Sequence, residues 1–351
     1  MPFVRSLSGL SHRTILSGFL LLFAAGLGFW SFVPSALAAD PLTIYSGRSE
    51  RLIKPVLDSF TANTGISVEL LSSGTTELVN RLKAEGDRTP ADLLITNDAG
   101  SLELARMAGL LYPLNMQEVE QAIPTQFRAS DNAWIGLSGR FWVVVYNRTM
   151  VQPNQVKSLL DLADPKWKNK IAIPNSGSEY LQAGVSIIRA THGDEKTRQF
   201  LQGIKINADS QVYQKSSQIV DAVAKGQVAL GIVNHYYVYR HLAVQPDAPI
   251  AVLIPDQQEG GMGAIMNVAG IGVVKSSKHL DSAKQLVEFL VAQAGQKLFA
   301  DLDKEYPLRQ DVKADPALVE RNSFRAATIP LSKLAELREP TLVLIEQVGL
   351  R

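Results

Sequence analysis

Two adjacent tyrosines, Tyr236 and Tyr237, are the residues in this chain best suited to bind a cation. Hard cations prefer oxygen ligands, and a phenolate is an anionic oxygen donor. Because the phenol pKa is about 10 in water, a highly charged cation would have to displace the phenol protons, and binding would weaken on acidification. The alternative interpretation is aromatic packing at the edge of a core, which the run Tyr-Tyr-Val-Tyr also fits.

The residues around this pair predict the start of a helix. An apolar run at 229–233 predicts a strand, and Asn234 is a favourable helix N-cap residue. The two tyrosines would then lie in the first helical turn, at the C-terminal edge of a sheet, where the helix dipole favours anions. Arg240 follows Tyr236 by four positions and Tyr237 by three, so it can face both and stabilise a phenolate.

Other side chains could complete an oxygen-rich site. Tyr180 follows a Ser-Gly-Ser turn at another expected helix start, although it could instead pack within that helix. Arg140 and Arg48 could each hold a planar oxyanion through a bidentate fork, or could form a salt bridge. His235 adjoins the tyrosine pair, and we interpret it as a cap or surface residue.

Alternating strands and helices must position these side chains. Strands expected in the first third of the chain lie at 42–45, 67–71 and 92–95. Strands expected in a second run lie at 171–173, 228–233 and 250–254. The strand–helix order of the first run predicts a mostly parallel sheet with helices on both faces, and the two runs together predict an α/β protein. Two long β-rich stretches, 134–147 and 264–274, connect the runs, which indicates two lobes with a hinge and a ligand cleft.

Composition excludes several classes of site. The chain has 351 residues and no cysteine, so it has no disulfide scaffold, CxxC zinc site, iron–sulfur site or thiol nucleophile. Lys and Arg total 35 against 34 Asp and Glu, which gives no electrostatic footprint for nucleic acid. No P-loop, dinucleotide or GxSxG motif is present, so we expect a binding protein and not an enzyme.

The first 38 residues have the layout of a secretory signal peptide. Basic residues precede an apolar run from Ile15 to about Val33, and Pro34 and the small-residue site at 36–38 follow. An uncleaved membrane anchor is the alternative, because the apolar run approaches the length that spans a bilayer. We expect cleavage and a mature protein that is soluble outside the cytoplasmic membrane.

Seven segments in order resemble the ferric-binding-protein family, the periplasmic iron(III)-binding proteins of bacterial ABC importers. The matching segments are Tyr45-Ser46-Gly47-Arg48, Ala91-Asp92-Leu93-Leu94-Ile95-Thr96, Ser138-Gly139-Arg140-Phe141, Asp161-Leu162-Ala163-Asp164-Pro165-Lys166-Trp167-Lys168, Ser176-Gly177-Ser178-Glu179-Tyr180, Asn234-His235-Tyr236-Tyr237 and Glu305-Tyr306-Pro307. The resemblance implies a type II periplasmic binding protein fold with interleaved lobes. Lobe one would hold 40–138 and 264–314, and lobe two would hold 139–263 and 315–351.

The same resemblance implies the ligands. Tyr180, Tyr236 and Tyr237 would bind Fe(3+), and Arg140 would hold a carbonate-type synergistic anion, with Arg48 as a second candidate. Many relatives carry His or His-Tyr just after the first Ser-x-Arg, where this chain has Ser49-Glu50. Glu50 could add a carboxylate, but a solvated acid in a first helical turn is the simpler interpretation. The expected site is therefore three tyrosines plus exogenous oxygen donors.

The function that follows is capture of ferric iron in the periplasm and delivery to an inner-membrane ABC permease by a monomeric carrier. The alternative within binding proteins is a carrier of an organic or phosphonate-type anion, with the two arginines as its clamp. An enzyme on the same scaffold is a third class, but the absence of cysteine excludes the thiol-anchored cofactor of the deaminase that shares such a fold.

The signal peptide gives a direct prediction. Protein isolated from the native cell should begin at Ala39 or Asp40, because the small-residue site at 36–38 directs cleavage after residue 38. Intact-mass measurement and N-terminal sequencing would check this. Finding residues 1–38 still attached would favour the membrane-anchor interpretation.

Overall fold

The computed structural model describes residues 40–350, so the expected signal peptide and its cleavage site at 36–38 lie outside the described residues. From residue 40 to residue 350, no helix is both long enough and apolar enough to cross a bilayer.

The strands form one ten-stranded sheet in the order β2–β1–β3–β9–β4–β7–β5–β6, with β8 and β10 also paired to β4. Their bounds are β1 Leu42–Ser46, β2 Val68–Ser72, β3 Leu93–Thr96, β4 Ile135–Asn147, β5 Ile171–Pro174, β6 Val212–Tyr213, β7 Leu230–Asn234, β8 Ile250–Leu253, β9 Met266–Val273 and β10 Tyr306–Pro307. The α-helices are α1 Glu50–Thr64, α2 Thr75–Glu85, α3 Ala99–Met107, α4 Gln117–Ala122, α5 Glu179–Ala208, α6 Ser216–Ala224, α7 His235–Val244, α8 Leu280–Val291, α9 Gln293–Asp303 and α10 Lys333–Val348.

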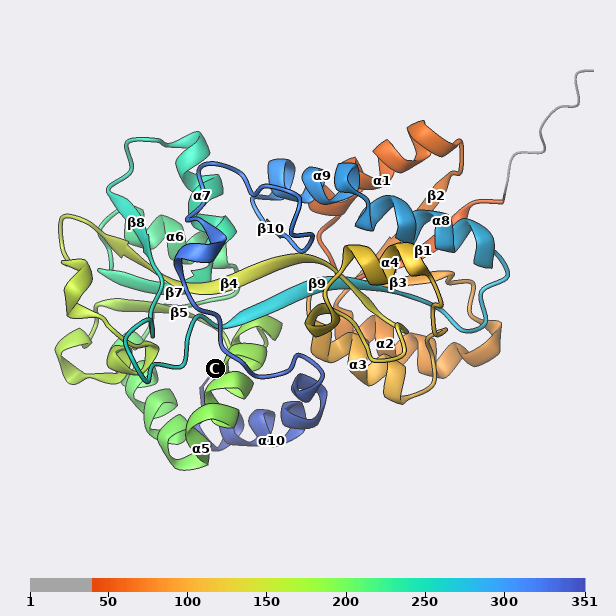
Figure 1. The fold of residues 1–351 in the computed structure, drawn as a ribbon. Helices are drawn as coiled ribbons and strands as arrows, with labels where there is room; N and C mark the ends of the chain where they lie inside the picture. Colours follow the sequence, from red (N-terminus) through yellow and green to blue (C-terminus); the bar gives the residue numbers. More distant parts are fainter. Residues whose placement is uncertain (1–39, 351) are drawn as a thin grey trace, which may run out of the picture. The chain divides into compact units, whose positions relative to one another are not determined.

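Two long strands divide this sheet into two halves. β4 pairs with β9 as far as Phe141, and it pairs with β7 from Trp142 onward. We call β2, β1, β3, β9 and residues 135–141 of β4 the first half-sheet. The second half-sheet comprises residues 142–147 of β4 with β7, β5, β6 and β8. Figure 1 shows β4 and β9 running alongside each other between the two halves.

The two crossing strands are confirmed, and the parallel pairing expected from the first strand–helix run is found there, but the sheet as a whole is mixed. Strands joined by helical crossovers are parallel, as in the pairs β1–β2, β1–β3 and β5–β7. However, β4 is antiparallel to β9, β7, β8 and β10, and β9 is antiparallel to β3. Two strands that pass in opposite directions between two α/β units must be antiparallel to each other, so the sheet is mixed.

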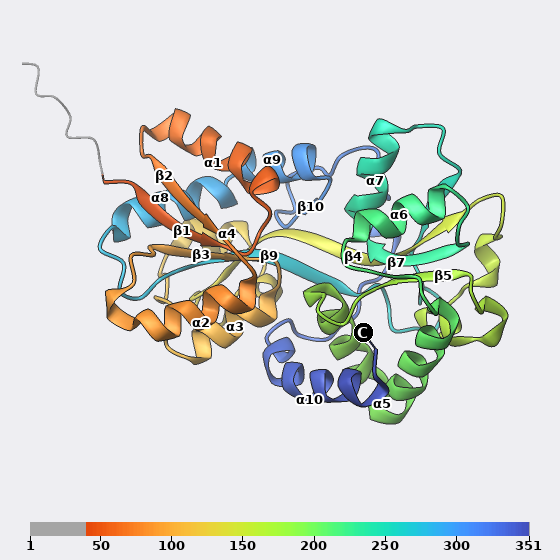
Figure 2. The same ribbon diagram turned by 180° about the vertical axis from the view of Figure 1, so that it is seen from behind.

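Helices cover both faces of each half-sheet. In Figures 1 and 2, α1, α8 and α9 lie on one side of the first half-sheet, and α2 and α3 lie on the other. In α1 the buried residues Ile53, Val56, Leu57 and Phe60 recur at helical spacing, so this helix presents one apolar stripe to the core. The helix ends at Gly65, which adopts the left-handed conformation that favours glycine, with φ of 76°.

Candidate functional site

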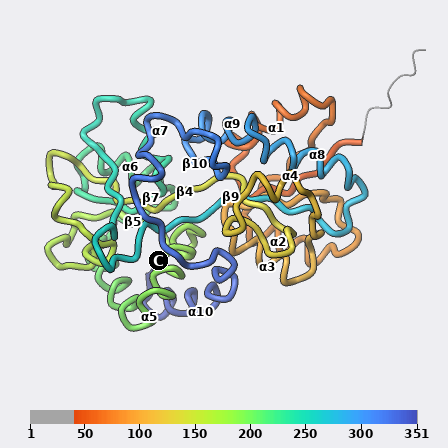
Figure 3. Tube along the Cα trace, viewed as in Figure 1, coloured from red at the N-terminus to blue at the C-terminus, as the bar shows by residue number. Residues whose placement is uncertain are grey.

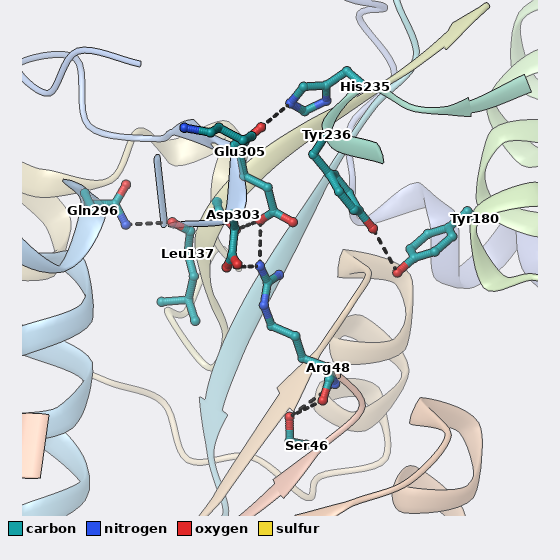
Figure 4. A network of polar contacts seen from close by, with 11 residues as sticks. Ser46, Arg48, Leu137, Tyr180, His235, Tyr236, Gln296, Asp303 and Glu305 are labelled. Atoms are coloured by element: carbon teal, nitrogen blue, oxygen red, sulfur yellow. Dashed lines mark hydrogen bonds and ion pairs between the residues drawn. The ribbon is translucent and has the colours of Figure 1, made fainter. Parts of the chain in front are cut away.

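Three tyrosines meet where two helices of the second half-sheet begin. Tyr180 is in the first turn of α5, where the Ser178 hydroxyl caps the helix by accepting from the Leu181 N–H. Tyr236 and Tyr237 are in the first turn of α7, directly after β7, so the expected helix start is confirmed. The hydroxyl groups of Tyr236 and Tyr180 are 3.4 Å apart, and Figure 4 shows them pointing toward each other.

The two adjacent tyrosines stack instead of diverging. The ring centroids of Tyr236 and Tyr237 are 4.3 Å apart, with 32° between the ring planes. Tyr236 is buried, whereas Tyr237 is half-buried and lines a cleft of about 530 Å³ together with Tyr180. Gly47 and Thr75, which adjoin the first half-sheet, line the opposite side of this cleft. In the first turn of α7, the adjacent side chains of Tyr236 and Tyr237 therefore lie close together. In the middle of a helix, adjacent side chains would point in different directions.

Burial favours the protonated form of Tyr180 and Tyr236. Desolvation is the main reason that the pKa of Tyr180 is raised, and the nearby Tyr237 adds to the effect. Desolvation also raises the pKa of Tyr236, with contributions from Tyr180 and Tyr237. Arg140 acts in the opposite direction on both groups. A cation that binds here must therefore displace protons, which it can do only if its charge is high.

Arg140 is a buried cation without a hydrogen-bonding partner. It lies in β4 with 1% of its surface exposed, and within residues 40–350 none of its three guanidinium nitrogens has an acceptor. The guanidinium carbon is 5.1 Å from the centre of the Tyr180 ring. Buried polar groups are nearly always hydrogen-bonded, and buried charges are usually paired. An anion at this position would supply the missing acceptors.

Two side-chain amide nitrogens near Arg140 also lack hydrogen-bond acceptors within the described residues. Asn234 and Asn267 line a small cavity of about 10 Å³ beside Arg140 and Tyr180, and the Nδ2 of each lacks a partner within the described residues. The Oδ1 of Asn267 accepts from the N–H groups of Ala99 and Val268, which fixes the orientation of this amide. The arginine and the two asparagines around the cavity thus carry five donor nitrogens that have no acceptor among residues 40–350. No sequence signal identifies Asn267, because only the β4–β9 register places it opposite Arg140.

The expected role of Asn234 is partly wrong. It does stand at the N-cap of α7, but its side chain makes no capping hydrogen bond. Its amide lines the cavity instead, which leaves the Nδ2 available to an acceptor there.

Arg48, unlike Arg140, is paired with carboxylates. Its Nη2 lies 2.7 Å from Asp303 Oδ2 and 3.0 Å from Glu305 Oε2, and both side chains are buried (Figure 4). Glu305 also accepts a hydrogen bond from the Ser138 hydroxyl. Burial opposes ionisation of Glu305, but Arg48 and Arg140 outweigh it and lower its pKa. Arg48 thus occupies the salt bridge that the sequence left as an alternative, although its Nε and Nη1 lack partners in the described part of the chain.

His235 is a buried cross-link and not a surface residue as expected. Its Nδ1 accepts from the Phe141 N–H at 3.1 Å, and its Nε2–H donates to the Lys304 carbonyl at 2.9 Å. Desolvation lowers the pKa of His235 to about 4, so the ring is neutral at pH 7. Both ring nitrogens are therefore used by the backbone, and the histidine ties the first turn of α7 to β4 and to the chain before β10.

The remaining candidates lie nearer the surface. Arg240 is half-buried on α7, where burial and Arg51 lower its pKa and the charges of Asp303 and the two α7 tyrosines act in the opposite direction. Glu50 is exposed in the first turn of α1, as the simpler interpretation expected. Its N-cap residue, Ser49, is also exposed and makes no capping hydrogen bond through its side chain.

The contrast between the two arginines gives a prediction about stability. Arg48→Met should lower the free energy of unfolding of the metal-free protein by about 3–5 kcal/mol, because Asp303 and Glu305 would lose their buried counter-ion. Arg140→Met should cost less than half as much, because it removes a charge that has no hydrogen-bonded partner. Urea denaturation of both variants would measure the difference. Equal losses would mean that Arg140 is also a structural partner of Glu305.

Comparison with known proteins now identifies the family. Residues 56–326 match the model of the bacterial extracellular solute-binding proteins. The chain is 30% identical to iron uptake protein A1 of Synechocystis sp., an alignment that covers 96% of this chain and 95% of the relative. It is 33% identical to the Fe(3+)-binding periplasmic protein of Serratia marcescens, covering 87% and 90% respectively.

Solved structures agree with this match. The ferric binding protein from Campylobacter jejuni superposes with a TM-score of 0.83 at 28% identity, covering 88% of this chain and all of that one. The fold is the type II periplasmic binding protein fold, with two α/β lobes, two crossing strands and a cleft. The chain belongs to the bacterial extracellular solute-binding protein family and is a relative of its periplasmic ferric-iron-binding members.

Proposed function

We propose that this protein captures ferric iron in the periplasm through the phenolate oxygens of Tyr180, Tyr236 and Tyr237. The observation that carries the proposal is the convergence of these three phenols at the starts of two helices, beside a cleft. Ferric ion is a hard trivalent cation, so three phenolates would neutralise it with oxygen donors. The names of the related proteins from Synechocystis and Serratia, which refer to iron uptake and Fe(3+) binding, support the same cargo.

A second element of the proposal is a synergistic anion held by Arg140. Three phenolates fill half of an octahedral shell, and Glu50 is exposed, so exogenous oxygen donors would complete it. A bidentate oxyanion such as carbonate would fill two of the open positions, and Arg140 would neutralise it and donate hydrogen bonds to its oxygens. The Nδ2 groups of Asn234 and Asn267 line the same cavity and could donate to this anion.

The lobe arrangement suits a carrier that opens and closes. We propose lobe one at 40–138 and 264–314 and lobe two at 139–263 and 315–351, with the hinge in the crossing strands β4 and β9. Hinge closure around a bound ligand is a common transition in such proteins. The protein would act as a monomer without enzymatic activity, and it would pass its iron to an inner-membrane ABC permease.

The phenolate ligands can be tested individually. Tyr180→Phe and Tyr237→Phe each remove one anionic oxygen and keep the ring, so ferric affinity should fall by at least about tenfold. The thermal midpoint of the metal-free protein should change little, because the packing of each ring is retained. Competition with a chelator, followed through the visible tyrosine-to-iron absorption band, would measure affinity.

Tyr146→Phe provides the matched control, because Tyr146 is half-buried in β4 and pairs with Leu230 away from the cleft. It should bind iron like the parent. If both cleft variants also bind iron like the parent, the tyrosine site is wrong. If the parent binds a phosphonate but no iron, the alternative anion carrier replaces the proposal.

The anion role predicts a change in bicarbonate dependence. Arg140→Ala should bind iron more weakly, with an absorption band that is shifted but not abolished, and with less response to bicarbonate. Arg140→Lys should recover only part of the effect, because a point charge cannot replace the planar fork. Iron titrations at several bicarbonate concentrations would measure this. An unchanged bicarbonate response in Arg140→Ala would falsify the role.

A further inference from the structure

The C-terminal helix α10 contacts helices that cover both half-sheets. Toward the second half-sheet it packs along α5, where the hydroxyl oxygens of Ser186 and Thr341 are hydrogen-bonded at 3.0 Å. Lys205 of α5 also donates to the carbonyl of Val348, at 2.9 Å. Figures 1 and 2 both show α10 beside α5. Because α5 begins at Glu179, α10 is fixed to the helix that carries Tyr180 in its first turn.

The chain that leads into α10 is also fixed to the second half of the molecule. Figure 3 traces this segment between β10 and α10. The Arg325 guanidinium donates to the carbonyl of Gln258 at 2.9 Å and to that of Gly261 at 3.1 Å, and both acceptors lie in the proposed lobe two. These contacts, with those to α5, hold both ends of the segment 325–348.

The other side of α10 reaches the first half-sheet through Arg338. Its Nη2 donates to Thr76 Oγ1 at 2.7 Å, and its Nη1 donates to Ser101 Oγ at 3.1 Å. Thr76 is in the first turn of α2, next to the cleft residue Thr75, and Ser101 is near the start of α3. The Ser101 hydroxyl donates to Asp98 Oδ2 at 2.7 Å, so its lone pair is oriented to accept from Arg338.

Close packing supports this contact. A Cβ atom on Gly100 of α3 would lie 2.9 Å from the Cβ of Leu334, so only glycine lets α10 approach α3 this closely. Leu334 is buried, one turn before Arg338. The packing of α10 against α5 and α3 therefore places the Arg338 guanidinium next to the hydroxyl groups of Thr76 and Ser101.

We infer that Arg338 is an inter-lobe clasp that holds the Tyr180-bearing half of the cleft against α2 and α3 and thereby slows release of the cargo. The part of this inference that concerns cargo release rests on the proposed function, which is ferric-iron binding. A hinge motion in β4 and β9 that opened the cleft would carry α5 and α10 away from α2 and α3. The two hydrogen bonds of Arg338 would then have to break, so the clasp favours the closed arrangement. Arg338 is a positioning residue, because it is not among the groups proposed to touch the iron.

The test measures iron release from the ferric-loaded protein. After addition of excess chelator, loss of the visible band should be about three- to tenfold faster in Arg338→Ala than in the parent, as expected for the loss of hydrogen bonds from a charged donor. Thr76→Val, which removes one acceptor and keeps the side-chain shape, should have a smaller effect in the same direction. Arg338→Lys should be intermediate. The absorption maximum should not move, because the iron ligands are unchanged.

A double-mutant cycle separates the clasp from general weakening. Combining Arg338→Ala with Thr76→Val should release iron no faster than Arg338→Ala alone. Arg88→Ala is the matched control, since Arg88 is exposed and forms no ion pair within residues 40–350, and it should behave like the parent. Parental release from Arg338→Ala, or effects that add in the double variant, would overturn the inference.

A metal-free measurement distinguishes failure of the clasp from failure of the proposed function. Hydrogen exchange of the amides in the first turns of α2 and α3 should be faster in Arg338→Ala than in the parent and in Arg88→Ala. If the parent gives no iron band, the proposed function fails. The hydrogen-exchange comparison would still show whether Arg338 holds α10 against α2 and α3. Equal exchange in all three proteins would overturn the inference.

Discussion

The site depends on two buried arginine side chains that lie near the crossing strands β4 and β9. Two arginines, Arg48 and Arg140, are buried within this region, and the hydrogen-bonded carboxylates Asp303 and Glu305 both belong to Arg48. Arg140 remains with nitrogens that have no acceptor inside the described residues. Buried donors without acceptors are unfavourable, so the cost of burying Arg140 is met only in part by the charge of Glu305. The anion proposed above would supply these acceptors at the point where the three tyrosines meet.

The backbone delivers the tyrosines to this charge. A strand that is buried throughout, β7, ends at Asn234, and α7 begins at the next residue. The neutral His235 then uses both ring nitrogens to attach that helix start to β4 and to the chain before β10. The stacked rings of Tyr236 and Tyr237 therefore follow a helix start that is attached to β7, to β4 and to the chain before β10. Precise placement of ligand groups requires such support from residues that do not themselves touch the ligand.

Much of the fold could be predicted because its signals are local. The strands expected at 42–45, 67–71 and 92–95 are β1, β2 and β3, and the two long β-rich stretches are β4 and β9. Strand direction was less accessible, since it depends on how the two units are connected across the molecule. The tyrosine pair was also found in sequence, because its N-cap and its first-turn position are set by neighbouring residues. The cavity partner Asn267 could not be found, because it meets Arg140 only through the β4–β9 register.

The types and local positions of the chemical groups are already evident in the sequence: phenols at two helix starts, one arginine after the first strand and one in the first crossing strand, and no cysteine. The difference between the two arginines arises from tertiary contacts: Arg48 is paired with carboxylates, and Arg140 has no hydrogen-bond acceptor among the described residues. Arg48 meets Asp303 across 255 positions of sequence, and no local pattern reports a pairing over that distance. The same holds for Arg338, whose acceptor Thr76 lies 262 positions away. Local rules set secondary structure because caps and periodicity act within a few residues, whereas the pairing of buried charge is set by which strands and helices come together.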